Sequence, residues 1–168
     1  LRDRKWRETN ERITLSSNAM LSENSKGRLS NEEHDEFRTI FERDRDRIIH
    51  SKAFRRLKHK TQVFINPDGD HFITRMTHTL NVTQVGRSIA KTLGLNPDLT
   101  EAICLGHDVG HSPFGHTGED ILNEMHPNGW SHSENSVKIF SKIEKLNLSV
   151  ETIDGIEKHP WRYSEKPS

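Results

Sequence analysis

The sequence has little of what marks secreted or membrane proteins. Its 168 residues include one cysteine, Cys104, so no disulfide can form within the chain. No apolar run approaches the roughly 18 residues that a membrane-spanning helix needs. The charged first residues do not resemble a signal peptide. These absences favour a cytoplasmic globular protein in which Cys104 is a buried thiol.

Net charge is also absent, because 25 basic residues balance 25 acidic ones. The balance fails locally at residues 52–60, which hold five cations and no acid: Lys52, Arg55, Arg56, Lys58 and Lys60. Such a cluster indicates either an anionic partner or a solvated helix face. Composition alone leaves both interpretations open.

The spacing of apolar residues predicts an all-α fold. Residues 1–36 are polar and predict an arm or loop, ordered against a neighbouring subunit, while residues 37–168 predict the folded domain. A turn at residues 66–70 favours a short β-hairpin near residues 63–73. Helices are expected at about 38–58, 75–94, 98–108, 117–125, 133–146 and 150–158.

Two of these segments carry histidine on an apolar stripe. In 75–94 the stripe is Met76, Leu80, Val85, Ile89 and Leu93, and in 98–108 it is Leu99, Ala102, Ile103 and Gly106. Packing the stripes together would bring His78 near His107 and Asp108, where an unpaired polar group is costly. A divalent cation would satisfy all three side chains. The alternative is a pair of hydrogen-bonded core histidines beside a polar residue at a helix end.

A glycine-punctuated segment follows, and with it the resemblance to a family becomes specific. After His107 and Asp108 the sequence continues as Val-Gly-His111-Ser-Pro-Phe-Gly-His116-Thr-Gly-Glu119, and upstream stand Arg75-x-x-His78 and Phe54-Arg-Arg-Leu-Lys-His-Lys-Thr-Gln62. These motifs resemble the HD-domain metal phosphohydrolases, and within them the deoxyguanosine triphosphate triphosphohydrolases. The similarity covers residues 41–159.

The resemblance implies an all-α HD-domain helical bundle with a divalent metal ion, which could be Mn, Mg, Fe or Zn. His78, His107 and Asp108 would be three of its four protein ligands. In the family the fourth is an aspartate on a later helix, and the sequence ends at Ser168 before any such segment. We therefore expect the HD domain of this chain to be incomplete at its C-terminal end.

The resemblance also implies an activity, the hydrolysis of deoxynucleoside triphosphates, dGTP favoured, to deoxynucleoside and tripolyphosphate. His116 would be the catalytic acid, Glu119 would orient it, and His111 would assist. Four residues would bind substrate: Arg75, whose planar guanidinium suits phosphate oxygens, together with Gln62, Arg56 and His132. Gln62 could equally be a loop amide and His132 a surface polar residue.

Partners follow from the same resemblance. We expect a nucleotide substrate, a homo-oligomer that covers a thin core, and an effector, either single-stranded DNA or a nucleotide. Three alternatives stay open: a different HD-domain phosphohydrolase, a non-catalytic nucleotide-binding regulatory module, and a nucleic-acid-binding protein that works through residues 43–60.

Overall fold

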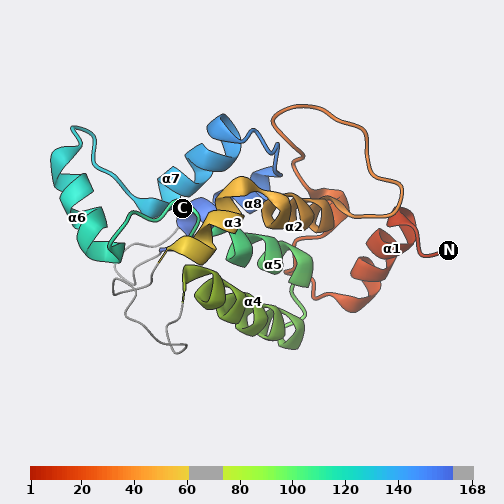
Figure 1. Cartoon of the computed structure of the whole chain (residues 1–168). Coiled ribbons are helices and arrows are strands. Elements are labelled where there is room, and N and C mark those ends of the chain that lie inside the picture. The colour runs from red at the N-terminus through yellow and green to blue at the C-terminus, as the bar shows by residue number, and fades with distance from the viewer. Residues whose placement is uncertain (61–73, 161–168) are drawn as a thin grey trace.

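The computed structural model describes residues 1–60 and 74–160, and the predicted all-α fold is confirmed there (Figure 1). No strand forms within these ranges, where an isolated antiparallel bridge joins Arg28 to Ser149. The predicted hairpin at 63–73 and Gln62 lie outside the described residues. Within the described ranges, no helix is both long and apolar enough to span a membrane.

The centre of the fold is α5 (Pro97–Gly106), which contacts α4 (Arg75–Thr92), α2 (Ile40–His50) and α8 (Val150–Lys158). Asn96 starts α5 because its side chain accepts hydrogen bonds from the next two free amides, with Pro97 at the first helical position. The core gathers around this helix, and its largest fully buried side chains include Ile48, Leu57, Leu105, Val109, Phe140 and Ile156.

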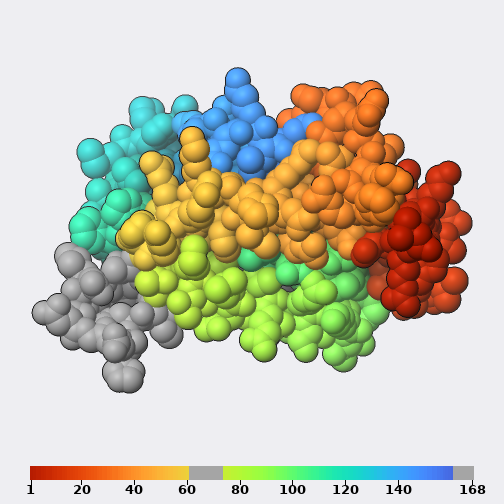
Figure 2. Space-filling model, turned by 45° about the vertical axis from the view of Figure 1, so that its right-hand side comes forward, coloured from red at the N-terminus to blue at the C-terminus, as the bar shows by residue number. Residues whose placement is uncertain are grey.

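The helix expected at 38–58 is broken at Ser51. Ser51 is extended, and its hydroxyl accepts the Phe54 amide, so it ends α2 and caps α3 (Lys52–Arg56), which runs into η2 (Leu57–His59). Figure 2 shows this part of the chain as a band across the molecule, with α4 on one side and the segment after residue 130 on the other. The break directs the chain toward the end of α5.

The packing predicted between the apolar stripes of α4 and α5 is wrong. Four stripe residues of α4 are at least half exposed: Leu80 (50%), Val85 (58%), Ile89 (53%) and Leu93 (60%). The buried face of α4 carries Arg75 and the smaller Thr79, Thr83 and Ala90. A Cβ at Gly86 would lie 2.9 Å from the Cys104 sulfur. Small residues therefore let the two helices approach closely, and the large ones face outward.

The expectation of an arm or loop at 1–36 is corrected by a helix there, α1 (Arg4–Thr14), followed by the short η1 (Ser22–Asn24). Asp3 explains the start of α1, because its carboxylate accepts the Trp6 amide. The segment after η1 is bound to α2 by an ion pair, in which the Arg28 guanidinium lies 2.5 Å from the fully buried Asp44.

The C-terminal half contains α6 (Gly115–Met125), α7 (His132–Lys138) and α8. The helix expected at 133–146 ends earlier, because α7 passes into a π-helical turn, η3 (Ile139–Ile143). α6 lies at the opposite end of the molecule from α1 (Figure 1), and of its own residues only Gly115 is buried. α7 returns to the body and packs on α8.

Candidate active site

The structure brings His78, His107 and Asp108 together, as the sequence predicts. One donor atom from each side chain lies within 4.8 Å of the others. His78 comes from the first turns of α4, and the other two follow directly after α5. The group opens into a cavity of about 410 Å³, lined by Arg75, His78, His107, Asp108, His111, His116, His132, His159 and Pro160.

The imidazole of His107 is oriented by its own helix. Its Nδ1 lies 2.7 Å from the Cys104 carbonyl oxygen. Because a carbonyl only accepts, Nδ1 carries the hydrogen and Nε2 presents a lone pair 3.6 Å from Asp108 Oδ1. Burial lowers the pKa of His107, which favours the neutral ring. A neutral imidazole held by a backbone carbonyl is the form that binds metal ions.

Asp108 is buried but ionised. Burial alone would raise its pKa, yet the charge that His107 carries when protonated, together with the charge and hydrogen bond of Arg75, outweighs burial and leaves the pKa below its ordinary value. Arg75 Nη1 donates to Asp108 Oδ2 at 2.7 Å. The donor set is thus two imidazoles and a charged carboxylate in a partly buried pocket, which fits a divalent cation.

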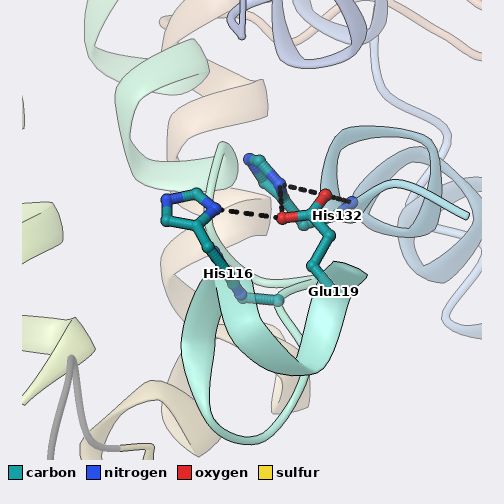
Figure 3. Close-up of side chains that lie close together, drawn as sticks. His116, Glu119 and His132 are labelled. Atoms are coloured by element: carbon teal, nitrogen blue, oxygen red, sulfur yellow. Dashed lines mark hydrogen bonds and ion pairs between the residues drawn. The ribbon is translucent and has the colours of Figure 1, made fainter. Parts of the chain in front are cut away.

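A second group of side chains has donor atoms within 4.8 Å of one another: His111, His116, Glu119 and His132. Its three histidines line the same cavity. Figure 3 shows the imidazoles of His116 and His132 both bonded to the Glu119 carboxylate. Its Oε2 lies 3.2 Å from His116 Nδ1, and its Oε1 lies 2.8 Å from His132 Nδ1 and accepts the His132 amide at 2.9 Å. Burial works against its charge, but the bonds from His132 leave the pKa of Glu119 lowered.

The histidines of this second group differ in exposure. The His116 side chain is 80% exposed, whereas that of His132 is 9% exposed. His111 is buried and stacks on His132 with ring centroids 4.6 Å apart. Burial, helped by the charge of Arg75, lowers the pKa of His111 to about 4, so this ring is neutral near pH 7. Within this group, His116 is therefore the histidine whose ring is open to a ligand.

The predicted substrate-binding residues are distributed unevenly. Arg75 and His132 line the cavity, and Arg56 lies exposed on α3, outside the lining residues. Lys60, from the same basic cluster, donates to the carbonyl oxygens of Val109 and His111 at 3.0 and 2.9 Å. Lys60 therefore holds the backbone of residues 109–111 and does not belong to a solvated helix face.

Sequence reasoning missed His159. It follows α8 directly and lines the cavity beside His107 and His132. Burial lowers the pKa of His159 to about 4. The available signal was its place one helical turn after the buried Ile156, which continues the inward face of α8.

Comparison with known proteins agrees with this geometry. The family model described as "HD domain" matches residues 75–166, more than half of the chain. A deoxyguanosinetriphosphate triphosphohydrolase-like protein of Clostridium tetani is 56% identical over 160 residues, which are 93% of this chain and 46% of that protein. One from Caldanaerobacter subterraneus is 58% identical over 149 residues, 86% of this chain and 44% of that protein.

A third protein of that name, from Pelagibacter ubique, is 55% identical over 152 residues, which are 85% of this chain and 41% of that protein. The chain thus spans less than half the length of these curated relatives. The matching family model, the helical fold and the His and Asp side chains gathered at the end of α5 agree, and the chain belongs to the HD domain family.

Proposed function

We propose that this chain carries the active site of a metal-dependent deoxynucleoside triphosphate triphosphohydrolase. The observation that carries the proposal is one cavity lined both by a three-residue metal donor set and by an exposed histidine that a carboxylate holds. The names of its relatives support the same class of substrate. The reaction would release the deoxynucleoside and tripolyphosphate, with dGTP the favoured substrate.

His78, His107 and Asp108 would hold the divalent cation, and their mixed nitrogen and oxygen donors suit Mn, Mg, Fe or Zn. When bound, such a cation would polarise the α-phosphate and would lower the pKa of a bound water toward neutrality. The protein prepares the donors in advance, because the Cys104 carbonyl fixes the ring of His107 and Arg75 fixes the carboxylate of Asp108.

His116 would give a proton to the leaving 5′ oxygen. Glu119 accepts from its Nδ1, which leaves Nε2 for the leaving group and stabilises the charged ring. His116 is the one histidine of its group with a largely exposed side chain, so the ring is accessible to a bound nucleotide. His111 and Arg75 would face the phosphates, with Arg75 adding positive charge.

Contacts beyond the cavity are part of the same proposal. Arg56, exposed on α3, would reach the nucleotide from outside the lining residues, and Gln62 would also bind the nucleotide. A homo-oligomer and an effector site for single-stranded DNA or a nucleotide would complete the protein. The exposed face of α4 and the exposed cations of α3 suit such contacts.

Phosphorus NMR of the reaction products tests the activity. The protein, at full natural length and with manganese, is mixed with each of the four deoxynucleoside triphosphates, and an Asp108→Ala variant is the control. Tripolyphosphate with free deoxynucleoside is the expected result, largest for dGTP. Orthophosphate or pyrophosphate would indicate another HD-domain phosphohydrolase. Bound but unchanged nucleotide would indicate a regulatory binding module.

A further inference from the structure

His159 is in direct contact with the second histidine group. Its Nε2 lies 2.9 Å from His132 Nε2, and the two ring centroids are 4.9 Å apart. The same ring meets His107 edge-on, with centroids 5.1 Å apart. His159 therefore stands between the two halves of the cavity.

The hydrogen atoms of this contact can be assigned from the partners. His159 Nδ1 lies 2.8 Å from the Ile156 carbonyl oxygen, and His132 Nδ1 lies 2.8 and 2.9 Å from the two Glu119 oxygens. All of these oxygens only accept, so each ring already donates from Nδ1. A bond between the two Nε2 atoms then requires one ring to carry a second hydrogen.

The bond to His159 completes a continuous chain of side chains. His159 and His132 share a hydrogen between their Nε2 atoms, His132 donates to Glu119, and Glu119 accepts from His116 at 3.2 Å. Both ring nitrogens of His132 are thereby engaged by protein groups. The first member comes from the end of α8, and the last lies in the first turn of α6.

Close packing of α8 on α5 holds His159 in this place. A Cβ at Gly106 would lie 2.5 Å from Ile156 Cδ1, and a Cβ at Gly155 would lie 2.3 Å from Ile103 Cδ1. Two glycines therefore permit an approach that larger residues would prevent. Because α8 is fixed against the helix that ends beside His107, its last turn can serve as a rigid support.

We propose that His159 is a positioning residue of this active site: it holds His132 through the bond between their Nε2 atoms, and through His132 and Glu119 it fixes the orientation of His116. The inference rests on the proposed function, in which His116 is the proton donor. His159 itself would touch neither the leaving group nor the phosphates.

Nitrogen-15 NMR tests the contact without any assay of activity. In protein with 15N-labelled histidine and no paramagnetic metal, we expect a scalar coupling between the Nε2 atoms of His132 and His159, carried by the shared hydrogen. The Nδ1 signal of His116 should shift in His159→Leu and stay near its original position in His159→Gln, whose amide can replace the lost partner. No coupling, or a His116 signal insensitive to His159→Leu, would overturn the proposal.

Kinetics test the positioning role. In the protein at full natural length, His159→Leu should lower kcat by about tenfold to a hundredfold with KM and metal content unchanged, and His159→Gln should restore most of the rate. Thermal unfolding checks that both variants fold, and His126→Ala, an exposed histidine outside the cavity, is the matched control.

Two kinetic outcomes would contradict the inference. If His159→Leu loses metal while the rate per bound metal is unchanged, His159 acts through His107. If kcat is unaffected, it has no role in the reaction. Absence of turnover in the unmodified protein would overturn the proposed function, and the NMR coupling would then still decide the contact between the two rings.

Discussion

Arg75 Nη1 donates a hydrogen bond to Asp108 Oδ2 at 2.7 Å, and each side chain is only 6% exposed. The residue expected to bind phosphate therefore also holds the carboxylate that would bind the metal. The ion pair fixes one carboxylate oxygen, while Oδ1 remains on the side of His107. Such support is common for metal-binding carboxylates, so the roles of Arg75 and Asp108 cannot be separated by removing Arg75.

The metal assignment predicts that Asp108→Ala loses metal and turnover together. The variant also leaves the Arg75 guanidinium buried beside an empty space, which should cost about 3–5 kcal/mol of unfolding free energy. Asp108→Asn is the sharper test, because the amide oxygen still accepts from Arg75. We expect this second variant to keep much of the stability but not the metal, as measured by urea unfolding and elemental analysis. Full metal content in Asp108→Asn would remove Asp108 from the ligand set.

The proton-donor assignment predicts the opposite pattern for His116. His116→Ala should keep its metal and its fold, because the side chain is 80% exposed, while kcat falls by about 10²–10⁴-fold. Single-turnover kinetics with elemental analysis separate the two effects. His126→Ala should leave both quantities unchanged. A His116→Ala variant with full rate would show that another group delivers the proton.

Local sequence signals predicted much of the site. His107, Asp108, His111, His116 and Glu119 fall within one short segment, so their proximity needed little knowledge of the fold. His78 also lies at this point, as predicted, although the apolar stripe from which it was predicted faces outward. Helical spacing after Ile156 turns His159 inward, but its contact with His132 depends on how closely α8 packs on α5, and only the pair of glycines Gly106 and Gly155 hints at that packing.

The sequence predicted the class of the fold, but it did not predict which faces of the helices are in contact. Periodicity located α4, α5 and α8 within a few residues. It assigned the wrong face of α4 to the core, because hydrophobicity ranks Val85 and Ile89 above the buried threonines of α4 and above Gly86, which lies against Cys104. The break at Ser51 is a capping effect, which apolar spacing does not report.

Stability should fall as the pH is lowered from about 6.5 to about 4 in metal-free protein. The pKa of His111 and that of His159 are both lowered to about 4 by burial, whereas unfolded histidine has a pKa of about 6.5. In this window the unfolded chain binds more protons, so the free energy of unfolding increases with pH. Urea unfolding in chelator across these pH values measures the slope, and His159→Gln should make it shallower. A flat profile would contradict both shifts.

Gly110 should not tolerate alanine, because backbone atoms surround it. A Cβ there would lie 2.3 Å from the Ser136 nitrogen and 2.4 Å from the His132 carbonyl oxygen. The first turn of α7 must move to admit it. We expect a loss of about 1–3 kcal/mol in urea unfolding and a lower kcat, since His132 moves with that turn. Gly86→Ala is the control, because its nearest atom is a single side-chain sulfur at 2.9 Å. Equal effects of the two substitutions would refute the argument.

The N-terminal segment should be part of the folded unit because Arg28 neutralises a carboxylate in the core. Asp44 is fully buried, and its second oxygen accepts from the Ser149 amide at 2.9 Å and the Thr152 hydroxyl at 2.8 Å. Arg28→Met leaves that charge without its cation, so we expect a loss of about 3–5 kcal/mol in urea unfolding. Adding Asp44→Asn removes the charge and should recover part of the loss, since the amide oxygen can keep its bonds from α8. If Arg28→Met changed stability by less than about 0.5 kcal/mol, the size of an ordinary surface substitution, residues 1–36 would be an arm held only by its surface.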